Sequence, residues 1–260
     1  MKLNLKLVTR LFLSVTPLIT GSVFAASPSF AASEACAATS VDFGLFSHNP
    51  FSIFTDTNTN TVAVAPDGTA TASADADAAF VVDPLVSLTT AYNTSESTTN
   101  GDGSSYFGLA QSTAVLGGYK FLVEAGETFS FNFKAFLGLE TSLDNPLAES
   151  ANSLGEIAFQ LYEETDSATT LLDSFTLNGN LTSSGDTDFI NLQHSENILF
   201  DSSDIFSSFG GLQESANALI QGKYSRTFAT PTYLSLFETK AVQASVGTFD
   251  FPNPQGLFLE

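Results

Sequence analysis

Residues 118–139 read GYKFLVEAGETFSFNFKAFLGL, two apolar runs on either side of the short connection Ala125-Gly126-Glu127. Phenylalanine recurs at every second position from Phe129 to Phe133, and side chains two apart lie on the same face of a strand. The pattern therefore predicts two antiparallel strands joined as a hairpin. The three phenylalanines are expected in a core, where burial of each contributes roughly 1.5–3 kcal/mol.

The same period of two continues elsewhere in the chain. Alanine fills every second position of residues 70–78, which predicts a strand with a shallow inner face and with threonine, serine and aspartate on its other face. Residues 156–163 and 170–177 predict a second hairpin. Residues 224–228 and 232–245 predict the last two strands.

Two segments depart from this pattern. Serine, threonine, asparagine and glycine dominate residues 93–105, which predicts a loop. Leu212, Ala216, Leu219 and Ile220 recur at helical spacing between glycines, which predicts a short covering helix at residues 212–222. The chain has 25 phenylalanines, no tryptophan and only 14% charged residues. It is therefore predicted to be all-β: an antiparallel β-sandwich, jelly-roll-like, with one or two short covering helices.

The N-terminus predicts export. Residues 1–26 combine three basic residues with an apolar run that ends at Ala25, which is typical of a cleavable signal peptide. The run is about 15 residues long, short of the roughly 20 that a membrane-spanning helix needs, so no membrane span is expected after cleavage. Residues 27–40 are expected to form a flexible leader, and residues 41–260 a single β-sandwich domain.

The composition of the exported part is strongly acidic. Removal of the first 26 residues leaves five basic residues against 28 acidic ones. Binding of nucleic acid or anionic lipid depends on lysine and arginine neutralising negative charge, so neither is an expected partner. The single cysteine, Cys36, excludes an internal disulfide. Together with the signal peptide, these features indicate a secreted or otherwise extracytoplasmic protein that depends on its core for stability.

Clustered carboxylates make calcium the one cofactor to consider. The candidate ligands are Asp56, Asp75, Asp77 and Asp102. Asp56 begins a stretch with oxygen-bearing side chains at the first, third and fifth positions of a calcium loop, but Thr61 stands where that loop requires glycine. A turn is the alternative interpretation of residues 56–60.

Recognised catalytic motifs are missing from the sequence. Its two histidines, His48 and His194, lie far apart, and neither accompanies a Gly-x-Ser-x-Gly elbow or a His-Glu-x-x-His helix. Both are interpreted as ordinary surface or hydrogen-bonded residues. The chain is therefore predicted not to be an enzyme, with an unrecognised hydrolase that uses two of the carboxylates as the remaining alternative.

Residues 119–133 (YKFLVEAGETFSFNF) and 222–228 (GKYSRTF) resemble the β-sandwich domains of exported bacterial proteins of the PEP-CTERM type and their cyanobacterial relatives. The resemblance implies an extracytoplasmic surface or matrix component. The sorting signal of that family is a Pro-Glu-Pro motif followed by an apolar helix and a basic cluster. Here residues 252–254 read Pro-Asn-Pro and six residues follow, so surface anchoring is not carried over.

Three functions are predicted in order of preference. They are a secreted or cell-surface structural or matrix protein without catalytic activity, a carbohydrate-binding β-sandwich module, and an unrecognised secreted hydrolase. The expected partners are extracellular polysaccharide or other surface proteins. Sugar binding without tryptophan would use phenylalanine or the six tyrosines, with Tyr106→Ala as the test. The tyrosines are Tyr92, Tyr106, Tyr119, Tyr162, Tyr224 and Tyr233.

Overall fold

The computed structural model describes residues 33–83, 88–165, 168–183 and 187–248, which belong to a compact unit formed by residues 31–260. The predicted signal peptide, the first part of the predicted leader and the Pro-Asn-Pro segment lie outside the described residues. Every regular element within these ranges is a β-strand. The strands are β1 (Ser33–Gly44), β2 (Ser52–Asp83), β3 (Leu88–Val123), β4 (Thr128–Leu143), β5 (Glu149–Glu164), β6 (Thr169–Thr182), β7 (Phe189–His194), β8 (Ile198–Ser208), β9 (Gln213–Thr227) and β10 (Thr232–Thr248). In these ranges no helix has the length and hydropathy needed to cross a membrane.

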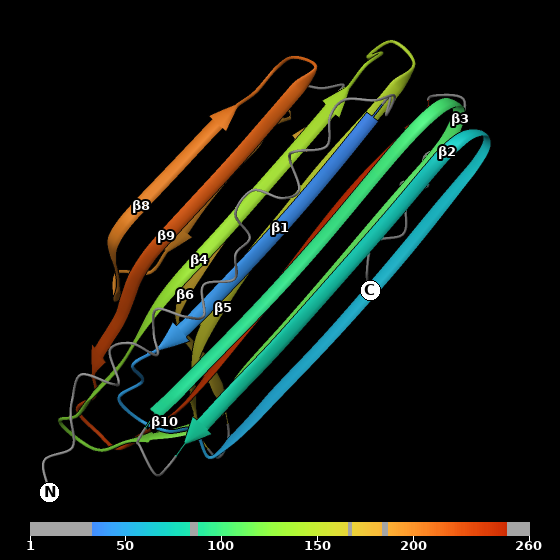
Figure 1. Ribbon diagram of the computed structural model, residues 1–260. Helices are drawn as coiled ribbons and strands as arrows, with labels where there is room; N and C mark the ends of the chain where they lie inside the picture. The colour runs from blue at the N-terminus through green and yellow to red at the C-terminus, as the bar shows by residue number, and fades with distance from the viewer. Residues whose placement is uncertain (1–32, 84–87, 166–167, 184–186, 249–260) are drawn as a thin grey trace, which may run out of the picture. The chain divides into compact units, whose positions relative to one another are not determined.

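The ten strands form one antiparallel sheet (Figure 1). Its strand order is β7-β6-β5-β10-β3-β1-β4-β9-β8, and β2 pairs with β3 outside this path. The predictions of an all-β class and of antiparallel pairing are confirmed. The predicted hairpin of residues 156–163 and 170–177 is also confirmed, because β5 and β6 pair with Phe159 opposite Phe175.

Strands β2 and β3 each turn back on themselves near the middle of their length. Residues 91–101 of β3 pair with β1, whereas residues 107–123 pair with β10. At the bend Gly68 of β2 lies opposite Gly103 of β3, next to a shift in the register of the pair. The φ angles of the two glycines are 134° and 116°, values that L side chains rarely adopt.

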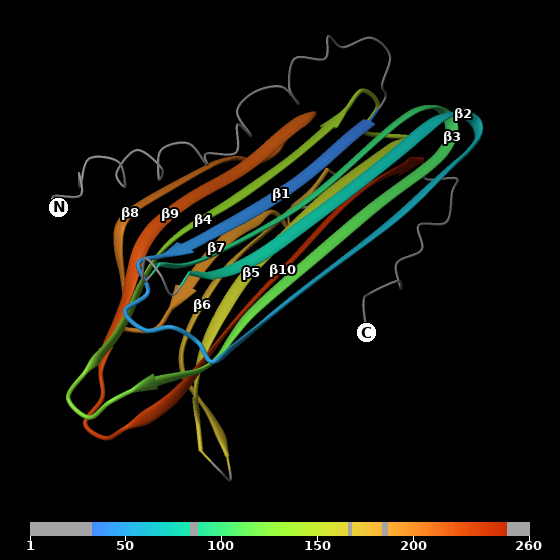
Figure 2. The ribbon, with the colours of Figure 1, turned by 60° about the horizontal axis from the view of Figure 1, so that its bottom comes forward.

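The bend divides the sheet into two halves that face each other (Figures 1 and 2). The β1 half contains β1, β4, β8, β9 and residues 69–83 and 88–101; the β10 half contains β5, β6, β7, β10 and residues 52–65 and 107–123. At the ends of the strand order, β7 and β8 approach each other, with the His194 and Phe200 rings 4.4 Å apart. In place of the two separate sheets expected for a sandwich, one continuous sheet is nearly closed on itself.

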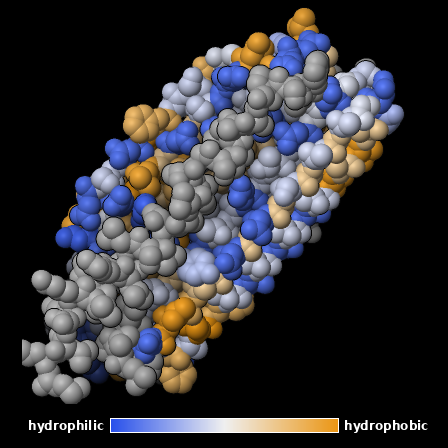
Figure 3. Space-filling model, viewed as in Figure 1, coloured by the Kyte–Doolittle hydropathy of each residue, from blue (hydrophilic) through white to orange (hydrophobic). Residues whose placement is uncertain are grey.

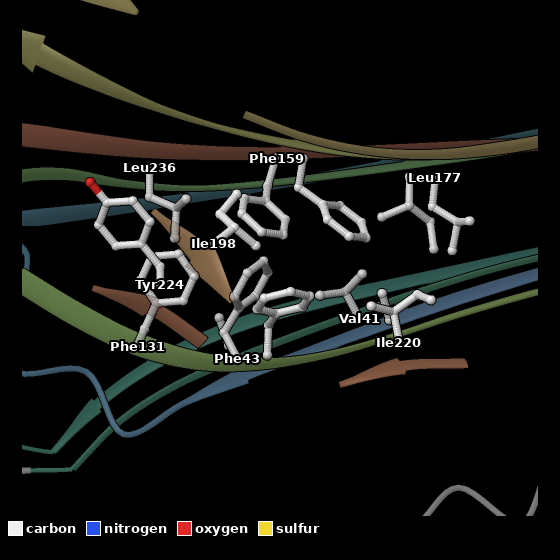
Figure 4. Packing of buried hydrophobic residues seen from close by; sticks show 14 of the residues in the cluster. Val41, Phe43, Phe131, Phe159, Leu177, Ile198, Ile220, Tyr224 and Leu236 are labelled. Carbon is white, nitrogen blue, oxygen red and sulfur yellow. The ribbon is translucent and has the colours of Figure 1, made fainter. Parts of the chain in front are cut away.

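Phenylalanine rings fill the space between the two halves. The Phe43 ring lies 5.5 Å from Phe159, and the Phe133 ring lies 5.1 Å from Phe159 and 5.2 Å from Phe175. These contacts join strands that are not hydrogen-bonded to each other, so they hold the halves together face to face. Figure 4 shows Phe43 pointing toward Phe159 across this core. The three phenylalanines of residues 129–133 are buried, as predicted.

The core narrows toward the bend in β2 and β3. The alanines of residues 70–78 are half-buried, whereas the threonine, serine and aspartate residues between them are exposed, as the alternation predicts. Ser112 Oγ in the β10 half donates a hydrogen bond to the carbonyl oxygen of Asp75 in the β1 half at 2.7 Å. The two halves therefore approach within hydrogen-bonding distance of each other here, and most inward side chains are small, with Tyr106 and Leu143 as the larger buried residues closer to the bend.

Residues 33–40, predicted to be part of a flexible leader, instead form most of β1. This strand pairs with β3 on one side and with β4 on the other. Ala35 and Ala37 are fully buried at its inward positions. Alanine has a low intrinsic preference for β-strands. The strand conformation of β1 is therefore stabilised by pairing with β3 and β4 and not by local sequence preference.

The predicted covering helix at residues 212–222 is wrong. From Gln213 onward these residues belong to β9, whose inward positions run at every second residue from Glu214 to Ile220. Helical and strand spacing coincide at Ala216 and Ile220. Pairing of β9 with both β4 and β8 decides in favour of the strand.

The predicted hairpin at residues 118–139 is also wrong, although both of its strands exist. Strand β1 lies between β3 and β4, so the connection at Gly126 crosses from the β10 half to the β1 half instead of joining neighbours. The Gly126 amide donates to the carbonyl oxygen of Phe228 at 2.7 Å, which ties this crossing to the β9–β10 connection. The predicted loop at residues 93–105 is likewise wrong, because β3 pairs with β1 as far as Gly101.

Candidate functional site

The outward surface of the β10 half carries mainly uncharged side chains over five adjacent strands. Residues opposite each other in an antiparallel pair share a face, and so do residues two apart on one strand. We call the following surface the neutral face. It consists of every second residue of 54–60 on β2, 111–117 on β3, 237–243 on β10, 154–160 on β5 and 174–180 on β6. Among these described positions, the charged residues are Asp56 and Glu156 alone.

Side-chain amides form a hydrogen-bonded row across the neutral face. Asn60 Nδ2 donates to Gln111 Oε1 at 3.1 Å, and Gln111 Nε2 donates to Gln243 Oε1 at 2.9 Å. These three residues lie opposite one another on β2, β3 and β10. Farther along the same surface, Asn152 Nδ2 donates to Asn180 Oδ1 at 3.3 Å. An amide carries two donor hydrogens and an acceptor oxygen, so Asn60 and Gln243 keep hydrogen-bonding capacity for a ligand.

Four aromatic rings lie toward the other end of the sheet from the amide row, with Phe54 and Phe237 six residues, or roughly 20 Å, along the strands from Asn60 and Gln243. The four rings are Phe54, Tyr119, Tyr162 and Phe237, which we call the aromatic group. The Phe237 ring contacts Tyr119 edge to face at 4.9 Å and Tyr162 at 5.9 Å. Gly117 lies between Phe54 and Phe237 in the register of the sheet. Phe54 is 45% exposed, so this end of the neutral face presents ring surface to solvent.

The four predicted calcium ligands are not brought together. Asp56 lies on the neutral face, whereas Asp75 and Asp77 project outward from the β1 half. Asp102 lies next to the bend in β3. Residues 56–60 form part of β2 and not the turn that was the alternative interpretation. Among the described residues, no group of three or more His, Cys, Asp or Glu side chains is arranged to hold a metal ion.

The outer face of the β1 half is acidic. Asp75 lies opposite Glu96, and Glu140 lies opposite Cys36. Burial raises the pKa of Glu140, and the nearby Glu34 carboxylate raises it further. Figure 3, seen from this side, shows mostly hydrophilic residues with small hydrophobic groups among them. The two outer faces of the sheet therefore differ in charge.

Two of the six tyrosines considered for sugar binding are buried. The Tyr106 hydroxyl lies 2.7 Å from Ser33 Oγ within the core, so Tyr106→Ala tests packing and not sugar binding. The Tyr224 hydroxyl donates to Asp173 Oδ2 at 2.9 Å. Tyr119 belongs to the aromatic group. Sequence alternation alone did not distinguish a packing role for Tyr119 from a role in sugar binding.

The two histidines lie at separate places on the surface. His48 Nε2 is 3.1 Å from Glu127 Oε2, and this hydrogen bond lowers the pKa of the Glu127 carboxyl. His194 Nδ1 is 3.0 Å from the carbonyl oxygen of Ser195. Both histidines are therefore hydrogen-bonded.

A charged cluster is buried between the two halves. Glu238 and Lys240 of β10 have fully buried side chains, and Lys240 Nζ donates to Glu238 Oε1 at 2.8 Å. Asn93 of β3, in the opposite half, donates from Nδ2 to the other carboxylate oxygen, Oε2. Burial raises the pKa of Glu238 and lowers the pKa of Lys240. None of the three was among the predicted site residues, although Glu238 and Lys240 gave an available signal as two charged residues at inward positions of an alternating strand.

No protein family model matches the chain, and comparisons with curated proteins and with solved structures find no match. The geometry of the described residues points to two candidate sites, the neutral face and the buried cluster of Asn93, Glu238 and Lys240.

Proposed function

We propose that the chain is a secreted or cell-surface structural protein, a component of an extracytoplasmic matrix without catalytic activity. The basic and apolar residues 1–26 support export. The resemblance of residues 119–133 to PEP-CTERM-type β-sandwich domains supports a surface or matrix location. We also infer that the two halves of the curled sheet act as the layers of a jelly-roll-like sandwich, which would give a matrix component a stiff body.

The neutral face is the observation that carries this proposal. Polysaccharides present closely spaced uncharged hydroxyl groups, which side-chain amides match as both donors and acceptors. The hydrogen bonds of the Asn60–Gln111–Gln243 row hold these amides in fixed orientations, which reduces the entropy lost when a ligand binds. The expected partner is therefore an extended polysaccharide that lies across the strands.

The aromatic group favours a second candidate function, that of a carbohydrate-binding module. Ring faces next to hydrogen-bonding groups bind ligands with one apolar and one polar side, as sugar rings have. In the aromatic group, the Tyr162 hydroxyl donates to Gln160 Oε1 at 2.7 Å, which fixes the ring beside Phe237. A module would bind short soluble oligosaccharides at this end, whereas a matrix protein would need the whole neutral face.

Co-sedimentation of the purified chain with insoluble polysaccharides, such as cellulose and chitin, tests both functions. The matrix function predicts saturable binding that the double variant Asn60→Ala/Gln243→Ala weakens at least tenfold. Thr94→Ala, on the outer face of the β1 half, is the matched control and should bind like the wild type. The module function predicts that Phe237→Ala removes binding of soluble oligosaccharides as well. Absence of binding to every polysaccharide tested would contradict both functions.

Location and catalysis are tested separately. Fractionation of a producing culture, with the mature N-terminus read by mass spectrometry, should find the processed chain in the cell-envelope or medium fraction. An intact chain confined to the cytosol would overturn the proposal. Turnover of model glycosides or esters above the rate in buffer would replace it with the hydrolase alternative.

A further inference from the structure

The buried cluster places an amine, a carboxamide and a carboxyl group together inside the core. Asn93 lies on β3 in the β1 half, opposite Val41 of β1. Lys240 lies on β10, opposite Ala114 in the β10 half. The carboxyl group of Glu238 connects them, with Lys240 Nζ on Oε1 and Asn93 Nδ2 on Oε2. One carboxyl group therefore touches both an amine nucleophile and an amide.

The cluster is poorly explained as a simple ion pair. Two charges in a dry core lose more hydration than their attraction returns unless further hydrogen bonds surround them. Among the residues that the structure describes, the Asn93 side-chain oxygen has no hydrogen-bond partner, and neither does the Ser95 hydroxyl two residues along the same inward face. Natural cores seldom keep such unsatisfied groups without a reason.

We propose that Lys240 and Asn93 form an intramolecular amide bond, with Glu238 as the catalytic residue that moves the proton. The Lys240 Nζ lone pair attacks the Asn93 side-chain carbonyl carbon, and a new N–C bond forms. Glu238 takes a proton from Nζ and delivers it to Asn93 Nδ2. The bond between that nitrogen and the carbonyl carbon then breaks, and ammonia leaves. No oxidant or second substrate is consumed, because one N–C bond replaces another.

The protonation states that this reaction needs are those that burial favours. Attack requires an uncharged amine, and burial lowers the pKa of Lys240 even though Glu238 and Asp42 oppose the shift. Proton delivery requires a carboxyl group that can hold a proton, and burial raises the pKa of Glu238. With Asn93 Nδ2 on Oε2 and Lys240 Nζ on Oε1, the same carboxyl group reaches both the nitrogen that loses the proton and the nitrogen that leaves.

The bond would act on stability as a disulfide does. It would join the two halves of the sheet covalently, in addition to the aromatic packing between them and the hydrogen bond from Ser112 to Asp75. The chain has one cysteine and so forms no internal disulfide. A link between residues as far apart as Asn93 and Lys240 should raise Tm by roughly 10 °C or more, by the loop-closure argument that applies to disulfides.

The mass of the unfolded full chain tests the proposal. The expected mass is lower by one ammonia than the mass of the sequence, after correction for the N-terminus actually found. Trypsin should fail to cut after Lys240, and the peptide that contains it should be recovered covalently attached to the peptide that contains Asn93. The full mass together with normal cleavage after Lys240 would overturn the proposal and leave the cluster as an ion pair.

Three variants separate the bond from the packing of the cluster. Glu238→Gln keeps the shape but loses proton transfer, so the full mass and cleavage after Lys240 should return. Asn93→Asp should lose water in place of ammonia and give the same cross-linked product as the wild type, a result that a structural role alone does not predict. Lys134→Arg, on the outer face of β4, is the control and should keep the cross-link. If Glu238→Gln does not fold, the Asn93→Asp product still decides the question.

Discussion

Gly68 on β2 lies directly opposite Gly103 on β3, and both have positive φ angles at the bend that separates the two halves of the sheet. A Cβ atom on Gly68 would lie 2.0 Å from the carbonyl oxygen of Asp102. A Cβ atom on Gly103 would lie 2.5 Å from the carbonyl oxygen of Asp67. The bend therefore needs glycine at both positions.

We predict that Gly103→Ala lowers the free energy of unfolding by about 1–3 kcal/mol, because it adds backbone strain and a steric clash. Thermal or urea unfolding followed by circular dichroism measures the change. Gly247→Ala is the control, since its Cβ would make only ordinary contacts of 3.4 Å or more. Equal stability of the two variants would contradict the role of the bend.

Phe133→Ala should cost about 3–5 kcal/mol of stability, because it leaves a cavity among aromatic rings of three other strands. Its ring lies 5.1 Å from Phe159, 5.2 Å from Phe175 and 6.4 Å from Phe200. Phe51→Ala, at a position 86% exposed, should change stability by less than about 0.5 kcal/mol. Chemical denaturation of both variants gives the comparison, and a small loss for Phe133→Ala would contradict the packing of the two halves.

The protein should unfold at a higher temperature at pH 5 than at pH 7. Burial raises the pKa of five carboxyl groups outside the buried cluster: Glu34, Asp42, Glu140, Glu149 and Glu214. A raised pKa means that the folded state binds the proton more tightly than the unfolded state. Stability is therefore gained as the pH falls through the folded pKa toward the ordinary values of 4.5 for the glutamates and 3.8 for Asp42, and it is lost again as the pH rises.

Glu140→Gln provides the matched test of this pH dependence. It removes a carboxylate that burial and the neighbouring Glu34 disfavour, so Tm at pH 7 should rise and the gain on acidification should shrink. Scanning calorimetry at the two pH values measures both effects. A wild-type Tm that falls between pH 7 and pH 5 would contradict the assignment.

Cys36 should react slowly with thiol reagents in the folded protein. Burial raises its pKa to about 11, and only the thiolate attacks such reagents. At pH 8 the folded protein should therefore react at least roughly 100-fold more slowly than the chain unfolded in guanidinium. Similar rates in the two states would mean that β1 is not the buried strand described above.

Alternation of residue types along the sequence correctly predicted the clearest strands. Pairing between strands that are distant in sequence determined the remaining structure. The alanines of residues 70–78 and the phenylalanines of residues 129–133 lie where their period of two places them. The connection at Gly126 has the composition of a hairpin, yet β1 separates its two strands, and no local signal marks that insertion. The inward residues of 33–40 are small and fit the core there, but small residues are also typical of a flexible leader.

The candidate sites were less predictable than the strands. Asn60, Gln111 and Gln243 come from distant parts of the sequence, and only the register of β2, β3 and β10 brings them into a row. Glu238 and Lys240 offered a usable signal, since alternation places both inward on β10. Their partner Asn93 lies in a segment whose composition predicted a loop, so the cluster itself required the fold.

Hydrogen exchange of β1 tests the account most directly, because the architecture requires this strand between β3 and β4. Exchange measured by mass spectrometry should show the amides of residues 35–43 protected as strongly as those of β4, with opening near the free energy of global unfolding. Complete exchange of residues 35–43 within seconds, while β4 stays protected, would contradict the central place of β1 in the sheet.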